Sequence, residues 1–209
     1  MTMTNIAAMG AGFTDSSFGS QAVFRSALHA LSHPGECVRI VHDAETPSLG
    51  HSASAALLLA LLDPDCKLWL SPSLASSDAV PWLRFHTGCV IVDEPNAAQF
   101  AWVAFADELP PLDAFPQGTD TYPDQSATCI VEVAAMTNDE SSADWVLTGP
   151  GIRAQRSLRI EDSPNGFVGQ WARNQDRFPR GVDMFFVVEE QIVGLPRTTR
   201  ISSATKEER

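Results

Sequence analysis

The segment SASAALLLALLDPDCKLWLS, from Ser52 to Ser71, decides the fold class of this chain. It begins with Ser52 as a helix N-cap, continues as an almost wholly apolar helix and stops at Asp63-Pro64. KLWLS follows directly and is typical of a buried strand. Because a helix that is apolar on most sides must be covered by other elements, we expect both segments to lie in a large core.

The flanking segments continue this alternation of helices and strands. On the N-terminal side, a helix starts at an N-cap Ser20 and ends at Pro34-Gly35, and a strand follows over Cys37–Val41. On the C-terminal side, SDAVPWLRFHTG predicts a helix capped by Asp78, with Pro81 in its first turn and Gly88 at its end. Two short strands, CVIVD and FAWVAF, come next, separated by the helical turn PNAAQ.

The second half of the chain contains more consecutive strands. A proline-rich segment over 107–125 is the longest predicted loop. After it we expect strands at 128–133, 144–152 and 156–161, a helix at 166–181, and two strands within 182–196 that meet at a turn at Glu189-Glu190. This order predicts one α/β domain over residues 1–209 with a mixed sheet and flexible ends at 1–12 and 202–209.

Composition and charge exclude several classes of protein. With 44% hydrophobic and 19% charged residues the chain is not generally disordered, and no apolar run approaches the length of a membrane helix. The net charge of −12 argues against binding to nucleic acid or to an anionic membrane. The first residues lack the pattern of a signal peptide, so we expect a cytoplasmic protein.

Charge is unevenly distributed, because the arginines gather late in the sequence. Residues 1–152 carry 4 basic and 18 acidic side chains, net −14, whereas residues 153–209 carry 10 and 8, net +2.

Metal, redox and lysine chemistry are not favoured. The four cysteines, at positions 37, 66, 89 and 129, form no C-x-x-C pair, so we expect buried, reduced thiols. His29 and His33 lie four residues apart but directly before a helix-breaking proline, which suits a surface or interface pair better than a metal site. Neither Lys67 nor Lys206 is well placed to form a Schiff base with pyridoxal phosphate.

The motif RFHTGC brings Arg84, His86 and Cys89 together at the end of a predicted helix. A Cys89–His86 pair would form a nucleophile and its base if the two side chains were in contact. Alternatively, Arg84 and His86 only offset the helix dipole at this carboxyl end. Both interpretations remain open from the residues alone.

The motif TGPGI places Thr148, Gly149 and Gly151 in a turn after an apolar strand. Its backbone amides would be able to approach an anion closely. A tight turn between two strands explains the motif equally well, and the third glycine and following helix of a dinucleotide site are missing.

Two proline turns carry arginines close to the C-terminus. FPRGVDMFF holds Arg180 in a Pro-Gly turn, and LPRTTR holds Arg197 and Arg200 after Pro196. The planar fork of an arginine matches phosphate, phosphonate or carboxylate oxygens, so these groups are candidates for anion binding. The alternative is an internal salt bridge, in which Asp183 or another acid neutralises Arg180.

The sequence resembles the PhnH family, the H subunit of the bacterial carbon–phosphorus lyase core complex. The resemblance rests on blocks that occur in order between Phe24 and Arg200: FRSALHALSHPGE, ALLLALLDPDCKLWL, WLRFHTGC, LTGPGI, FPRGVDMFFV and LPRTTR. It implies a three-layer α/β sandwich similar to pyridoxal-phosphate-dependent transferases, but without the cofactor. It also implies no iron–sulfur cluster in this subunit.

The resemblance further implies a function in phosphonate catabolism. Proteins of this family form homodimers and join the G, I and J subunits. The G, H and I subunits, with the L subunit, are associated with the displacement of adenine from ATP by an alkylphosphonate, which gives a ribose 1-phosphonate 5-triphosphate. No catalytic residue is implied for this subunit. The residues of the matching motifs are candidates for an anion site or an interface: Arg84, His86, Cys89, Thr148, Gly149, Gly151, Arg180, Asp183, Arg197 and Arg200.

Three hypotheses follow for the function. In the first, the chain supports the phosphonate-for-adenine exchange as one subunit of the complex. In the second, it is an autonomous enzyme with a Cys89–His86 nucleophile and base. In the third, it is a scaffold subunit that binds no ligand.

Overall fold

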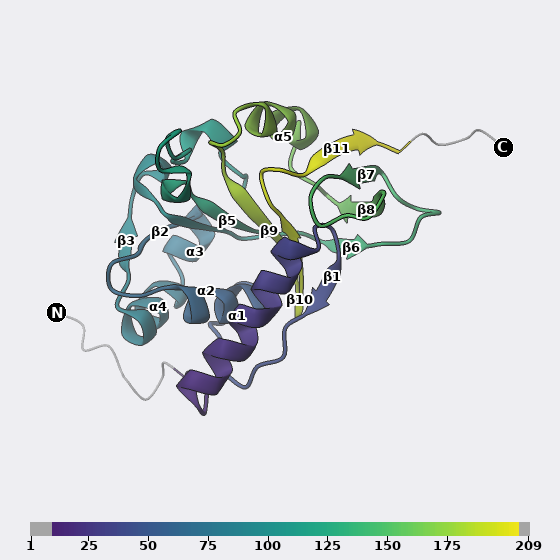
Figure 1. The fold of residues 1–209 in the computed structure, drawn as a ribbon. Helices are drawn as coiled ribbons and strands as arrows, with labels where there is room; N and C mark the ends of the chain where they lie inside the picture. The colour runs from purple at the N-terminus through teal and green to yellow at the C-terminus, as the bar shows by residue number, and fades with distance from the viewer. Residues whose placement is uncertain (1–9, 205–209) are drawn as a thin grey trace.

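The computed structural model describes residues 10–204, which form a layered α/β fold (Figure 1). Its helices are α1 (Ser16–Ser32), α2 (Ser52–Leu61), α3 (Pro72–Ala75), α4 (Ala79–Thr87) and α5 (Phe167–Asp176), with 3₁₀ turns η2 (Pro95–Ala97), η3 (Leu112–Ala114) and η4 (Pro123–Gln125). Its strands are β1 (Cys37–Arg39), β2 (Lys67–Leu70), β3 (Val90–Val92), β4 (Phe100–Val103), β5 (Thr128–Glu132), β6 (Ala135–Thr137), β7 (Trp145–Thr148), β8 (Arg156–Glu161), β9 (Asp183–Val188), β10 (Gln191–Leu195) and β11 (Arg200–Ser203).

A seven-stranded mixed sheet organises the molecule, with strand order β1-β10-β9-β5-β4-β2-β3. The five strands from β9 to β3 are parallel, and β10 and β1 add two antiparallel strands at one side. The turn between β9 and β10 falls at Glu189 and Glu190, as predicted, with Glu189 at a positive φ of 49°. The mixed sheet expected from the sequence is therefore confirmed.

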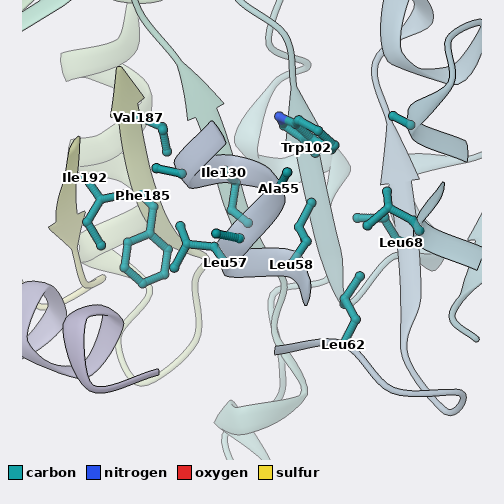
Figure 2. Packing of buried hydrophobic residues seen from close by; sticks show 14 of the residues in the cluster. Ala55, Leu57, Leu58, Leu62, Leu68, Trp102, Ile130, Phe185, Val187 and Ile192 are labelled. Carbon is teal, nitrogen blue, oxygen red and sulfur yellow. The ribbon is translucent and has the colours of Figure 1, made fainter. Parts of the chain in front are cut away.

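One face of this sheet is covered by α1, α2 and α4. Leu57 and Leu58 of α2 are fully buried and belong to the same apolar cluster as Trp102, Ile130 and Phe185 of the sheet (Figure 2). Residues 53–58 of α2 are all buried, which explains why this helix is apolar on nearly every side. The prediction that other elements cover the apolar helix of the Ser52–Ser71 segment is confirmed.

The opposite face of the sheet packs against α5 and a second, smaller sheet. Alternate strand residues such as Cys129, Val131 and Phe186 point to this face, where they meet Trp145 of β7 and Phe167 of α5. The period of two along a strand thus divides the core between two sides of one sheet. The rings of Phe167 and Trp145 stack at 5.4 Å between centroids.

The smaller sheet has four antiparallel strands in the order β11-β7-β8-β6. The strands β7 and β8 were expected, but β6 and β11 were not. Both unexpected strands are short, lie at the sheet's edges and lack a continuous apolar face, since no residue in either is fully buried. The short helix α3 was also missed.

Two predicted helix N-caps are wrong. The helix α1 starts at Ser16, not after Ser20, because the Asp15 carboxylate accepts hydrogen bonds from the N–H groups of Ser17 and Phe18. Ser52 does not cap α2; it is the first helical residue, and the N–H of Ala53 bonds to the carbonyl of Glu189.

Asp78 is the N-cap residue of α4, as predicted, although its side chain makes no capping hydrogen bond. Its carboxylate instead accepts from the N–H of Ser48. Pro81 does lie in the first turn of α4, and Gly88 ends the helix with a left-handed φ of 72°.

The expectation of flexible ends is only partly testable. Residues 1–9 and 205–209 lie outside the described residues. Ser202 and Ser203, within the C-terminal segment expected to be flexible, belong to β11, whereas near the N-terminus Ala11 forms two hydrogen bonds with Glu45. Between residues 10 and 204, no helix is long and apolar enough to cross a membrane.

Candidate functional site

The RFHTGC residues lie at the carboxyl end of α4, and within the part of the chain that the structure describes no hydrogen bond joins Cys89 to His86. Cys89 is 4% exposed, and burial raises the pKa of its thiol despite a hydrogen bond from Thr87 and the nearby charge of Arg84. His86 packs its ring against Trp82 and Phe85, and its Nε2 atom is buried without a hydrogen-bond partner in the described part of the chain. The geometry therefore favours the helix-end interpretation over a nucleophile with its base.

The TGPGI turn is a packing turn. Gly151 has a φ of 82°, and a Cβ atom there would overlap the carbonyl oxygen of Ser32 at the end of α1. A Cβ atom on Gly149 would lie 3.0 Å from the carbonyl oxygen of Thr198. Both glycines permit close approach of another chain segment, which explains them as packing residues, although Gly151 itself is exposed.

Arg197 is neutralised inside its own subunit. Its guanidinium donates to both carboxylate oxygens of Asp183, to the carbonyls of Pro123 and Pro179, and to the hydroxyl of Ser126. These bonds occupy all five N–H donors of the side chain. Because the Arg197 side chain is only 13% exposed, the internal salt bridge is the correct interpretation for this arginine.

Arg180 and Arg200 differ from Arg197 because both are exposed. Arg180 forms an ion pair with Asp120, with 3.2 Å between Nε and Oδ1, but the two side chains are 49% and 77% exposed. The acid that pairs with Arg180 is thus Asp120 and not Asp183. Arg200 lies in β11 opposite Thr148 of β7 and has no ion-pair partner among residues 10–204.

The candidate residues consequently separate into two groups. The LPRTTR segment joins the two turns, because Arg197 bonds to Pro179 of the FPRG turn and Thr198 contacts Gly149 of the TGPG turn. The group that contains Arg84 lies elsewhere, on α4 beside β2 and β3, as the positions of α4 and β11 in Figure 1 show. A single site built from all the predicted residues does not exist.

A different region has the position expected of a ligand site in an α/β sheet. The chain leaves β2 toward β3 on one side and leaves β4 toward β5 on the other, so the connections diverge between β2 and β4. Ligands of such sheets bind outside the carboxyl ends of the strands near this point. In this chain a pocket of ≈ 550 Å³ lies beside it, at the ends of β4 and β5.

Four carboxylates are the charged groups on the walls of this pocket. Glu132, at the end of β5, is 5% exposed and accepts hydrogen bonds from the N–H of His51 at 2.6 Å and from the indole of Trp102 at 2.8 Å. Burial alone would raise the pKa of Asp107, but hydrogen bonds from Ser71 and Ser73 outweigh it and leave that pKa below its ordinary value. The other acidic residues of the lining are Glu108 and Asp162.

The carboxylates of this pocket suit a ligand that donates hydrogen bonds. Its lining contains no lysine or arginine within the described ranges, so it does not suit a bare phosphonate or phosphate group. No cluster of three histidine, cysteine, aspartate or glutamate side chains between residues 10 and 204 is arranged to hold a metal ion. We missed this pocket from sequence, although one signal was present, since Glu132 is a carboxylate in the otherwise apolar strand TCIVEV.

Comparison with known proteins gives a consistent result. The sequence model of a family described as "Bacterial phosphonate metabolism protein (PhnH)" matches residues 11–202. A Rhizobium meliloti (strain 1021) protein named "Alpha-D-ribose 1-methylphosphonate 5-triphosphate synthase subunit PhnH" is 37% identical over 189 residues, which cover 90% of this chain and 93% of the relative. A Stutzerimonas stutzeri protein named "Putative C-P lyase subunit protein HtxG" is 31% identical over 183 residues, covering 87% of this chain and 85% of the relative.

Proposed function

The chain belongs to the PhnH family of bacterial phosphonate metabolism proteins, and on this premise we propose that it is a subunit of a carbon–phosphorus lyase core complex. In that complex it supports the displacement of adenine from ATP by an alkylphosphonate, which gives a ribose 1-phosphonate 5-triphosphate. The observation that carries the proposal is the family match over residues 11–202, together with a relative named as a subunit of the corresponding synthase. The chain acts as a homodimer with the G, I and J subunits.

The geometry of the candidate residues supports a subunit over an autonomous enzyme. Cys89 is buried with a raised pKa, and no hydrogen bond joins it to His86 in the part of the chain that the structure describes. A buried neutral thiol is a poor nucleophile. The isolated chain is accordingly expected to be inactive, and the catalytic groups of the complex are expected to include residues of its partners.

Exposed apolar side chains on α1 support an assembled state. Phe24 and Leu28 lie one helical turn apart and are 44% and 51% exposed, and Phe18 near the start of the helix is 73% exposed. Neighbouring exposed apolar groups of this kind commonly belong to a protein interface.

The scaffold hypothesis has one specific observation in its favour. The five donors of Arg197 are all engaged within the chain, so this arginine of the LPRTTR motif stabilises its own fold and has no free donor for a ligand. Calorimetric titration with ATP and with methylphosphonate, on the isolated chain and on the complex, separates a ligand-free scaffold from a ligand-binding subunit.

We also propose that the fold derives from that of pyridoxal-phosphate-dependent transferases and has lost the cofactor. The position of Lys67 supports this view. It lies at the amino end of β2, at the edge of the sheet opposite the carboxyl ends of the parallel strands, where a ligand is expected.

The principal test is reconstitution of the complex. The chain is coexpressed with the G, I and J subunits, one of which carries an affinity tag, and adenine release from ATP and methylphosphonate is measured with the L subunit added. We expect copurification and a loss of adenine release when this chain is omitted. A chain that stays separate from all partners, or a complex equally active without it, contradicts the proposal.

A surface variant refines this test. Phe24→Ser combined with Leu28→Ser should reduce the fraction that copurifies, whereas Tyr122→Ser, at a residue 56% exposed in a distant loop, should not. Equal recovery of both variants would show that α1 does not contribute to assembly.

A further inference from the structure

Two arginines at the carboxyl end of α5, Arg173 in its last turn and Arg177 at its C-cap, line a small surface recess that none of the sequence motifs includes. Arg173 and Arg177 are one helical turn apart, and the opposite wall is formed by η3 and the segment that follows it. The remaining lining consists of one carboxylate, three side-chain amides and one leucine: Asp113, Gln117, Gln170, Asn174 and Leu112.

Most amide groups of the recess are already engaged within the fold. Gln117 donates from Nε2 to the carbonyls of Leu112 and Phe115, and Asn174 bonds through both side-chain atoms to the backbone of Val182. These contacts hold the walls in place. Gln170 is different, because among residues 10–204 only its side-chain Oε1 is engaged, as acceptor from the N–H of Leu112 at 3.0 Å. Its Nε2 group therefore remains available as a donor.

The two guanidinium groups are poorly compensated. The side chain of Arg173 forms no hydrogen bond or ion pair with any residue between 10 and 204. Arg177 has only a 3.4 Å hydrogen bond to Oε1 of Gln117 and a 4.0 Å ion pair with Asp113, whose side chain is 63% exposed. Such an exposed pair contributes little, so most of the ten N–H donors on the two side chains remain free.

Two like charges at i and i+4 on a helix repel each other, and this repulsion is relieved when an anion lies between them. The recess itself is narrow, with a volume of ≈ 20 Å³, which is about the space of one water molecule. It can therefore seat one terminal oxygen of an anionic group, while the other oxygens meet the arginine forks at the surface.

From this arrangement we infer that Arg173, Arg177 and Gln170 form a binding site for the oxyanion of a small solute, a phosphoryl, phosphonyl or carboxyl group. The arginines supply paired, charge-assisted hydrogen bonds, and Gln170 supplies a neutral donor on the third side. Asp113 is the one unfavourable group, and its exposed side chain can turn into solvent when the anion binds.

The recess adjoins the carboxylate-lined pocket, because Gln170 lines both. A molecule whose oxyanion lies between the two arginines is thus placed to extend toward Glu108 and Asp162. Donor groups in one recess and acceptor groups in the next suit a ligand with an anionic end and hydroxyl or amino groups elsewhere.

The inference is tested on the isolated full-length chain by calorimetric titration at low ionic strength with inorganic phosphate, methylphosphonate and acetate. We expect phosphate or methylphosphonate to bind. The affinity for acetate then shows whether the site takes a carboxyl group as well as a tetrahedral phosphoryl or phosphonyl group. Arg173→Gln and Arg177→Gln should each weaken the affinity about tenfold. Arg173→Lys, which keeps the charge but loses the planar fork, should have a smaller effect.

Arg25→Gln is the matched control, because it removes one exposed arginine from α1 and should leave the affinity unchanged. Circular dichroism verifies that each variant is folded, which is expected because Arg173 stabilises no described neighbour. The inference is overturned if none of the three anions binds, or if the Arg173→Gln/Arg177→Gln variant binds as tightly as the unmodified chain. Since no partner subunit is present, this result is independent of whether the chain assembles into a complex.

Discussion

Asp183 and Arg197 are joined through both side chain and main chain. The Asp183 carboxylate accepts hydrogen bonds from the guanidinium of Arg197 and, at 2.8 Å, from its backbone N–H. Asp183 begins β9, and Arg197 lies in the turn that follows β10, so the pair fixes this turn against the central sheet. The same guanidinium reaches the carbonyls of Pro123 and Pro179 in two other segments.

The first prediction concerns this ion pair. Arg197→Gln should lower the free energy of unfolding by about 3 kcal/mol, because the largely buried Asp183 carboxylate loses its charged partner and keeps only the backbone N–H of residue 197, while two carbonyls lose the guanidinium donor. Urea unfolding measures the change, and Asp183→Asn should have a similar effect. The double variant should cost less than the sum of the two single ones.

Arg180→Gln provides the matched control from the second proline turn. Its partner Asp120 is 77% exposed, so the loss should be below about 0.5 kcal/mol. If Arg197→Gln were as mild as Arg180→Gln, the structural role assigned to Arg197 would be wrong.

The second prediction concerns the contact between the TGPGI turn and α1. Gly151→Ala should destabilise the fold by about 2 kcal/mol or more, because the new Cβ atom combines an unfavourable positive φ with overlap on Ser32. Gly166→Ala shares the positive φ, at 67°, but its Cβ atom would meet no atom within 4 Å. It should therefore cost only about 1 kcal/mol. Thermal unfolding of the two variants measures how much of the lost stability comes from the overlap with Ser32. Equal losses of stability in both variants would contradict this packing role.

The third prediction concerns thiol reactivity. Burial raises the pKa of Cys89, and it raises the pKa of the fully buried Cys129 still further, so both thiols stay protonated near neutral pH. Iodoacetamide at pH 7 should modify both residues much more slowly in the folded chain than in urea, as peptide mass spectrometry can measure. Rapid modification of Cys89 in the folded chain would revive the nucleophile hypothesis.

The fourth prediction concerns stability at acid pH. The pKa of Glu36 lies below its ordinary value of 4.5, chiefly because of its hydrogen bond with His29, with further help from the charge of Arg156. A carboxylate with a depressed folded pKa stabilises the fold above its unfolded pKa, and this contribution is lost as pH falls through the folded pKa. Glu36→Gln should therefore reduce the drop in urea midpoint that occurs from about pH 5 to about pH 3.

His29→Gln serves as the companion variant for this measurement, because it removes the hydrogen bond while leaving the carboxylate. It should reduce the same pH dependence, and adding it to Glu36→Gln should cause little further change. A pH profile unaltered in Glu36→Gln would show that the pair does not contribute.

The fifth prediction concerns the buried end of the carboxylate-lined pocket. Glu132→Gln should destabilise the chain by about 2 kcal/mol, because an amide N–H₂ group replaces one of the oxygens that accept from His51, Trp102 and Phe105. Glu108→Gln, on the exposed rim of the same pocket, should change stability by less than about 0.5 kcal/mol. Urea unfolding followed by tryptophan fluorescence reports both variants.

The sequence pattern alone predicted those features of the fold that depend on residues close together in the chain. The apolar run of α2, the short apolar strands of the main sheet, the Gly88 helix end and the Glu189-Glu190 turn were all predicted, and the ordered motifs identified the family. In each case the deciding interaction, such as a helical face or a turn conformation, involves residues a few positions apart.

The tertiary structure alone decided which distant groups meet. The sequence placed a cation at Arg197, but only the fold brings Asp183, Ser126 and the carbonyl of Pro123 around it. Likewise, the carboxylate-lined pocket and the arginine recess each combine segments that the sheet order and the packing of α5 bring together. Which distant residues contact one another depends on long-range packing, and the periodicity of a single segment does not determine it.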